Sequence, residues 1–232
     1  MTSSGAATSA LSEGRPVVGR MLSEHESKRL VAEFGVPVVD ELVAADPAAA
    51  AGAAEELGYP VALKINGEGI AHKTERGLVR LSLTTPHAVE SAAVELLANT
   101  RPEDGDVTLL VAAMVSGSRE LIAGVHRDPQ FGPCVMVGIG GVYAEALADV
   151  AFALVPIDEV DALEMLDALD GQALLSAIRG EAALDRQAVA EVLQGLSRLA
   201  VARPDIESVD VNPLVIANGR PVAVDALVEV GA

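Results

Sequence analysis

The stretch Tyr59–Leu83, YPVALKINGEGIAHKTERGLVRLSL, decides the fold of this chain. Its opening run, PVALKI, is apolar and β-favouring, and its closing run, LVRLSL, alternates apolar with polar residues at period two. Between these runs lie Gly67, Gly69 and Gly77, and residues without a Cβ tolerate the turns that leave backbone amides pointing at an anion. The stretch therefore predicts a strand, a glycine-containing loop and a second strand.

The loop also carries side chains that suit an anion. Lys64 stands at its entrance, and His72, Lys73 and Thr74 stand at its centre. Two cations and an imidazole beside free backbone amides indicate a phosphate-binding loop. The alternative is a long hairpin loop with surface lysines. The composition of the loop favours neither, so the choice depends on the rest of the chain.

The composition predicts a folded protein whose core is built from small aliphatic side chains. The 232 residues suffice for one large or two small domains, half of them are apolar, and there is no Trp. The net charge of −18 argues against a nucleic-acid partner, because a phosphate backbone is bound by clustered Lys and Arg. In so acidic a chain, the cations around the loop, Lys64, Lys73, Arg76 and Arg80, predict a local anion site.

The sequence gives no sign of secretion or of membrane insertion. Cys134 is the one cysteine, so an internal disulfide is excluded and a reducing compartment fits. No apolar run approaches the ~20 residues that span a bilayer. The first residues lack the charged start and apolar stretch of a signal peptide. We expect a cytoplasmic protein without a membrane partner, in which residues 1–20 form a disordered tail.

Local signals divide the chain into helices and strands in mixed order. A capping box at residues 23–26 begins one helix, Asp46-Pro47 and Thr85-Pro86 begin two more, and Asn218-Gly219 is a strong hairpin signal. The mixture predicts an α+β chain in two lobes, with subdomains 21–106 and 107–232. The expected helices are 23–34, 46–57, 85–100, 158–169, 171–179 and 185–201, and the expected strands are 36–43, 60–65, 78–83, 107–115, 119–127, 133–139, 152–156, 206–216 and 221–230.

A second group of polar residues lies in the closing hairpin. Asp210 and Asn212 are two residues apart on one strand and share a face, and the turn brings Asp225 back alongside them. Three oxygen ligands suit Mg²⁺, which takes one or two carboxylates together with substrate phosphates and water. The alternative is that Asn212-Pro213 merely starts a bend and both aspartates face solvent. Against it, Asp225 has apolar neighbours, and a carboxylate placed there needs a partner.

Two further features decide nothing by themselves. Glu120 begins the strand after a turn and is placed to hydrogen-bond a ribose hydroxyl, but a lone glutamate is commonly a solvated charge. Gly138, Gly140 and Gly141 follow a strand, a pattern that turns produce more often than nucleotide sites do.

The residues taken together resemble a known family. Their order is similar to that of the ATP-grasp domain of the ADP-forming acyl-CoA synthetases, also called acetate–CoA ligases, which are related to the β subunit of succinyl-CoA synthetase. The resemblance runs from Leu22 to Val230. The segments that carry it are LSEHESKRLVAEFGVPV, GYPVALKI, IAHKTERGLVRL, GSRELIAGVHRDPQFGPCVMVGIGGVYAEALADVAFALVPI, AIRGE, DVNPLVI and AVDA.

This resemblance implies an ATP-grasp fold with the nucleotide between two lobes, and it implies a phosphoryl transfer. In the family, the phosphoryl group of an acyl phosphate passes through histidine to the nucleotide. His72 corresponds to the phosphorylated histidine. Imidazole suits the task because it is largely neutral near pH 7 and nucleophilic through one nitrogen. Glu75 and Glu68 are the candidates to orient its other nitrogen.

The resemblance also implies the cofactors and their contacts. ATP or ADP and Mg²⁺ are the implied cofactors. The hinge reads VAAMV where relatives carry a polar residue before the methionine, so adenine selection rests on backbone groups. The implied nucleotide contacts are Lys64 and Lys73 with phosphates, Glu120 with ribose, and the backbone near Ala112 and Met114 with adenine, and the implied magnesium ligands are Asp210, Asn212 and Asp225.

A complete reaction of this kind needs parts that this sequence does not contain. The family's CoA-binding domain and its other catalytic histidine have no counterpart here, so we expect a separate CoA-binding α subunit that handles acyl phosphate and CoA. Two alternatives stay open. One is an ATP-grasp ligase in which an amine attacks an acyl phosphate directly, and His72 argues against it. The other is a non-catalytic nucleotide-sensing module.

Overall fold

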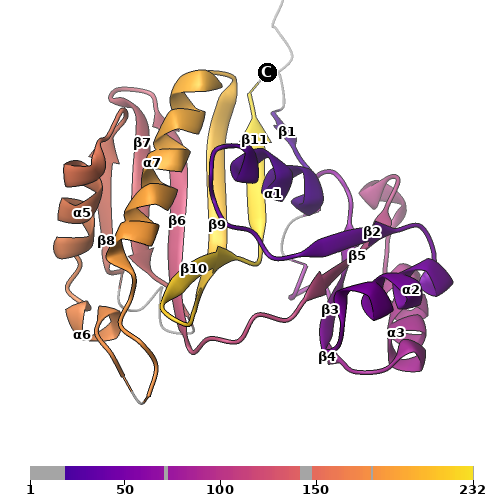
Figure 1. Ribbon diagram of the computed structural model, residues 1–232. Helices are drawn as coiled ribbons and strands as arrows, with labels where there is room; N and C mark the ends of the chain where they lie inside the picture. The colour runs from indigo at the N-terminus through magenta and orange to yellow at the C-terminus, as the bar shows by residue number, and fades with distance from the viewer. Residues whose placement is uncertain (1–18, 71–72, 142–147, 179, 232) are drawn as a thin grey trace, which may run out of the picture.

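The computed structural model describes residues 19–70, 73–141, 148–178 and 180–231. These residues form two sheets in separate lobes (Figure 1). The larger sheet has seven strands in the order β1-β11-β9-β6-β7-β8, with β10 also pairing with β9. The smaller has four strands in the order β2-β5-β3-β4. The predicted α+β class with two lobes is confirmed.

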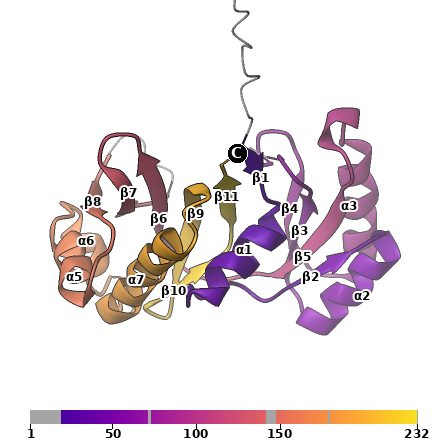
Figure 2. The same cartoon turned by 90° about the horizontal axis from the view of Figure 1, so that it is seen from above.

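The small lobe is an antiparallel sheet with two helices on one face. Its strands are β2 (Glu41–Ala44), β3 (Val61–Asn66), β4 (Val79–Leu83) and β5 (Thr108–Ala113), and its helices are α2 (Pro47–Leu57) and α3 (Pro86–Ala98). Asp46 and Thr85 cap the helices as predicted. Leu63, Leu96 and Val111 belong to a core of their own under these helices. The other face of the sheet is directed toward the large lobe (Figure 2).

The large lobe holds the second core. Its strands are β1 (Arg20–Met21), β6 (Arg119–Asp128), β7 (Gly132–Ile139), β8 (Val150–Leu154), β9 (Ile206–Ala217), β10 (Arg220–Ala223) and β11 (Ala226–Val230), and its helices are α1 (Glu24–Glu33), α5 (Glu159–Asp167), α6 (Gln172–Leu175) and α7 (Arg186–Ala202). Leu193 and Leu196 of α7 are fully buried against the sheet. Val31 of α1 belongs to the same core, so α1 packs with the large lobe although it precedes the small one in sequence. No helix in the described ranges is long and apolar enough to cross a membrane.

The closing hairpin differs from its prediction in one place. The turn at Asn218-Gly219 forms, and β10 pairs with residues 214–217 of β9. The second strand then breaks, and β11 pairs separately with residues 206–211. Asp225 lies in the break rather than within a strand. The interruption arises because β10 turns toward residues 37–39, whose backbone exchanges hydrogen bonds with Ala223.

Strand pairing also differs from the predicted division at 106/107. β5 follows that point, yet it pairs with β2 and β3 of the small sheet. The chain crosses to the large sheet only between Ala113 and Arg119. At the other end, Arg20 was expected in the disordered tail, but it pairs with Val230. Sheet partners distant in sequence decided both points. Residues 1–18 of the expected tail lie outside the described residues.

Candidate functional site

Two adjoining cavities lie in the cleft between the sheets and share Thr74 and Asp225. One, the apolar cavity, has a volume of about 270 Å³ and a mostly apolar lining; the other, the polar cavity, has a volume of about 360 Å³, and six of its nine lining residues are polar or charged. The predicted site residues that the structure describes line them. Lys64, Ala112, Met114 and Glu120 line the apolar cavity, Lys73, Asp210 and Asn212 line the polar cavity, and Asp225 lines both.

The apolar cavity has the character of a site for a flat ring. Ala62, Val79 and Leu81 come from the small sheet, and Val215 comes from the large one. The residues after β5 form one edge. There the Met114 amide donates to the carbonyl of Pro60 at 3.2 Å, so this N–H is already used. Within the described part of the chain, the next residue, Val115, makes no backbone hydrogen bond and also lines the cavity.

Lys64 enters the cleft from the most protected strand of the small sheet. All six residues of β3 are buried, and the Lys64 side chain is 9% exposed. Its ammonium donates to Glu24 Oε1 at 2.6 Å and to the carbonyl of Val224 at 3.0 Å, and it lies 3.6 Å from Asp225 Oδ2. Burial alone lowers the pKa of Lys64, but Glu24 and Asp225 outweigh that effect and raise it. The lysine is therefore kept as a cation inside the protein.

Glu24 is a site residue that sequence reasoning missed. Its side chain is fully buried and accepts from three lysines, namely Lys64, Lys28 at 2.8 Å and Lys73 at 2.5 Å. Burial raises the pKa of Glu24, yet the three ammonium groups prevail and hold it far below its usual range. The capping box of α1 forms as predicted, but it explains only Ser23 and Glu26. The available signal was the spacing of Glu24 and Lys28, which places them one helical turn apart.

The predicted cluster of four cations is only half correct. Lys73 lies beside Lys64, bonded to Glu24 Oε2 and 3.8 Å from Asp225 Oδ1. Arg76 instead donates to Asp104 at 2.8 Å. Arg80 reaches Glu95 at 3.3 Å on the helix-covered side. Both arginines therefore tie this part of the chain to neighbouring elements. They stay out of the cleft because each pairs with a nearby carboxylate.

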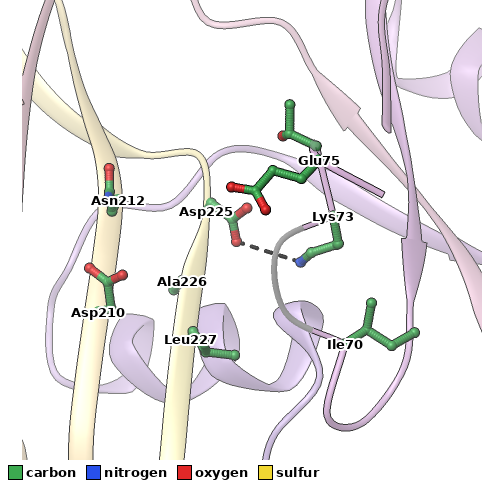
Figure 3. A pocket seen from close by; sticks show the side chains of 9 residues that line it. Ile70, Lys73, Glu75, Asp210, Asn212, Asp225, Ala226 and Leu227 are labelled. Carbon is green, nitrogen blue, oxygen red and sulfur yellow. Dashed lines mark ion pairs between the residues drawn. The ribbon is translucent and has the colours of Figure 1, made fainter. Parts of the chain in front are cut away.

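The polar cavity gathers the three predicted metal ligands. Asp210 and Asn212 project from β9, and Asp225 projects from the break just before β11 (Figure 3). Partial desolvation and the charge of Asp225 raise the pKa of Asp210. No group of three or more His, Cys, Asp or Glu side chains in the described ranges is arranged to hold a metal. Two carboxylates and one amide oxygen nevertheless fit Mg²⁺, which completes its shell with water and phosphate.

Of the residues predicted around the histidine, two are described. His72 itself lies outside the described residues. Glu75 lines the polar cavity. Glu68 pairs with Arg20 at 2.5 Å, so its carboxylate is engaged with β1. Of the two candidates to orient the imidazole, Glu75 therefore faces the cleft, whereas Glu68 is already paired.

Glu120 lies at the edge of the apolar cavity, next to Arg119, which makes several hydrogen bonds of its own. Its side chain lines the cavity, and its carbonyl accepts from the Gly140 amide at 2.8 Å. The neighbouring Arg119 is buried and makes four hydrogen bonds. It donates to Glu181 at 3.2 Å and to the carbonyls of Leu174, Ser176 and Ala182. Arg119 therefore supports the segment after α6, and Glu120 is the residue of this pair that meets the cleft.

Comparisons with known proteins identify the fold and the family. A family model described as an ATP-grasp domain matches residues 9–230. The β subunit of ADP-forming acetate–CoA ligase I of Pyrococcus furiosus is 35% identical over 94% of this chain and 93% of its own. The predicted ATP-grasp fold is confirmed.

Two solved structures of a Ca. Korarchaeum cryptofilum enzyme, described as a dinucleotide forming acetyl-coenzyme A synthetase 1, also match. The first, in complex with coenzyme A, Ca-AMPCP and HgCl⁺, has a TM-score of 0.85 at 33% identity, over 91% of this chain and 93% of that one. The second, with coenzyme A and Mg-AMPPCP, has its phosphohistidine segment pointing towards the nucleotide binding site. It has a TM-score of 0.79 at 33% identity, over 90% and 92%. The chain therefore belongs to the ATP-grasp domain family, among the relatives of the β subunits of ADP-forming acetate–CoA ligases.

Proposed function

We propose that this chain is the nucleotide-binding β subunit of an ADP-forming acyl-CoA synthetase. The overall reaction is acyl-CoA + ADP + phosphate = acid + CoA + ATP, and this chain transfers the phosphoryl group between His72 and the nucleotide. The observation that carries the proposal is the meeting of Lys64 and Lys73 with Asp210, Asn212 and Asp225 in one cleft. The family relationship supplies the reaction class.

The base and ribose of the nucleotide occupy the apolar cavity in this proposal. The Val115 amide is the donor toward adenine, since the Met114 amide is bonded to Pro60. Glu120 accepts from a ribose hydroxyl. The backbone of Ala112 is paired within the sheet, so Ala112 forms part of the cavity wall and makes no hydrogen bond to the base.

The phosphates lie toward the polar cavity. Lys64 and Lys73 bind them from the small lobe, and Asp210, Asn212 and Asp225 hold magnesium from the large lobe. Bound Mg²⁺ offsets the charge spread over the transferred phosphoryl group. The two lysines add their charge from the opposite side.

His72 accepts the phosphoryl group from the nucleotide or returns it. Its neighbour Lys73 lines the polar cavity and bonds Glu24. Glu75, rather than Glu68, is the candidate to orient the imidazole, because Glu68 is paired with Arg20. The acyl phosphate and CoA are handled by a separate CoA-binding α subunit. The naming of the Pyrococcus furiosus relative as a β subunit supports a partner chain.

Phosphorylation of the chain tests this proposal. The purified protein is incubated with γ-labelled ATP and Mg²⁺, and we expect a label that is labile in acid and stable in base, as phosphohistidine is. His72→Ala abolishes the label. The matched control is His87→Ala, because His87 is exposed at the start of α3 and lies in neither cavity. A label that survives in His72→Ala, or no label in the wild type, contradicts the proposal.

A further inference from the structure

The carboxylate of Glu24 lies behind the cleft and holds the two phosphate-site lysines from there. Its side chain is 0% exposed and lines neither cavity. Its two oxygens take different partners. Oε1 accepts from Lys64 at 2.6 Å, and Oε2 accepts from Lys73 at 2.5 Å. The Glu24 carboxylate thus links Lys64 of β3 to Lys73 of the loop. Without it, the two ammonium groups would lie side by side without this shared counter-ion.

Lys28 fixes this carboxylate from beneath. Its ammonium has three protons, and it has three partners: Glu24, Glu41 and the carbonyl of Val224. The Lys28 side chain is 1% exposed and lines neither cavity, so this lysine has no donor for a ligand. The helix itself is fastened to β11, because the Val228 amide donates to Ser27 Oγ at 3.1 Å. These contacts therefore hold the Glu24 carboxylate in a fixed position.

Lys64 and Lys73 differ from Lys28 because they have donors to spare. Lys64 makes two hydrogen bonds, to Glu24 and to Val224, and Lys73 makes one within the described part of the chain. Their further partner, Asp225, is 3.6–3.8 Å away, beyond hydrogen-bonding distance. Both lysines line the cavities. Each can bond a ligand oxygen without giving up Glu24.

We propose that Glu24 is a positioning residue, whose two oxygens set the separation of the Lys64 and Lys73 ammonium groups so that both meet the phosphates of one nucleotide. The inference rests on the proposed function, in which these lysines bind phosphate. A nucleotide does not displace Glu24, because the carboxylate is enclosed and bound by Lys28. Glu24 acts through the lysines and touches no substrate.

The test compares ADP with adenosine, which lacks phosphates, by ligand-observed NMR titration of the full chain. Glu24→Gln keeps the shape of the side chain and removes its charge. We expect the affinity for ADP to fall roughly tenfold or more, as for the loss of a charged hydrogen bond. Adenosine affinity stays within about twofold. The preference for ADP over adenosine is the decisive quantity, because a merely loosened fold weakens both ligands alike.

Two variants keep the test decisive if Glu24→Gln fails to fold. Glu24→Asp retains the charge that the buried lysines need but is too short to hold both, so it lowers the ADP preference as well. Glu41→Gln removes the other buried carboxylate beside Lys28 and leaves the ADP preference unchanged, because Glu41 bonds neither Lys64 nor Lys73. An unchanged or increased preference for ADP in Glu24→Gln or Glu24→Asp overturns the inference.

Failure of the proposed function looks different. Lys64→Met removes a phosphate contact directly. If it leaves the preference for ADP intact, the lysine does not bind phosphate and the proposed function itself is wrong. If Lys64→Met abolishes the preference and the Glu24 variants do not lower it, only the positioning role is wrong.

Discussion

The two halves of the cleft treat their charges in opposite ways. Lys64 and Lys73, on the small-lobe side, are nearly buried and share a carboxylate that the protein provides for them. Asp210 and Asn212, on the large-lobe side, are exposed, and neither has an ion pair or side-chain hydrogen bond within the described residues. The cationic half thus has its counter-ion within the chain, whereas the proposed function supplies that of the anionic half from outside, as magnesium.

This difference has a physical reason. A lysine ammonium taken out of water needs a permanent counter-ion, or it loses its proton. An exposed aspartate needs none, but two aspartates beside one another disfavour each other's charge. That is the condition of Asp210, whose pKa is raised by partial desolvation and by Asp225. A divalent cation relieves it. On the proposed function, the cationic half is therefore prearranged, and the anionic half awaits its cation.

Removal of Lys28 breaks the cationic half most severely. Lys28→Met leaves two buried carboxylates, Glu24 and Glu41, without their shared cation. Loss of one partner from a buried ion pair costs roughly 3–5 kcal/mol, so we expect the free energy of unfolding to fall by that order. Denaturant titration measures it. Arg29→Met, at an exposed position on the same helix, is the control and changes stability by less than about 0.5 kcal/mol. Equal effects of the two variants would contradict the comparison.

Removal of Lys64 breaks the function of the same half. On the proposed function, Lys64→Met takes away a charge that faces the transferred phosphoryl group, and groups of this kind contribute roughly 100-fold or more to the rate. We expect phosphorylation of the chain by ATP to slow by about that factor, measured in single-turnover assays. Arg80→Met serves as the matched cation, since Arg80 pairs with Glu95 outside the cleft. A rate that Arg80→Met lowers as strongly would show that the effect is one of net charge.

The pH dependence of stability sharpens the comparison. The folded-state pKa of Glu24 lies below its usual value of 4.5, so its ionisation stabilises the fold above that value. This stabilisation is lost as the pH falls through the folded-state pKa. We expect unfolding free energy to decline below pH 4.5 by up to about 1.4 kcal/mol per pH unit for this one proton. Glu24→Gln removes that part of the slope. An unchanged acid profile in this variant would show that Glu24 is not held ionised.

Neutralisation in the anionic half has the smallest effect and the opposite sign. Asp210→Asn relieves the repulsion from Asp225. In the absence of metal, we therefore expect the free energy of unfolding, measured by thermal denaturation, to rise by about 0.2–1 kcal/mol, the range for a pair of charges on neighbouring strands. Magnesium removes the advantage, because the wild-type aspartate then has a cation. Glu207→Gln, exposed on the same strand, is the control. A destabilised Asp210→Asn without metal would mean that Asp210 has a partner in the fold.

The parts of the fold that the sequence predicts are those with local causes. Asp46, Thr85 and the capping box of α1 each bond backbone within one turn, so their helices begin where expected. The placement of β5 depends on strands that lie far away in the chain, and no local pattern contains that information. The break at Asp225 has the same origin, since contacts of Ala223 with residues 37–39 produce it.

The candidate site divides in the same way. Asp210 and Asn212 were predicted because a strand pattern fixes which residues share a face, and Lys64 because it stands at the entrance of a glycine-containing loop. Glu24 was missed because its partners Lys64 and Lys73 are 40 and 49 residues away. Arg76 was wrongly placed in the site for the converse reason. Its charge suggested the cleft, but Asp104 lies nearer.

The attachment of α1 to β11 affects when the lysine cluster forms during synthesis of the chain. The Leu22 amide bonds Val228, and the Val228 amide bonds Ser27, so the first helix of the described chain is held by its last strand. Val224, just before that strand, accepts from both Lys28 and Lys64. While the chain is being synthesised, these partners do not yet exist. The lysine cluster is therefore assembled last, and a nascent chain gains its phosphate site only when residues 224–230 have emerged.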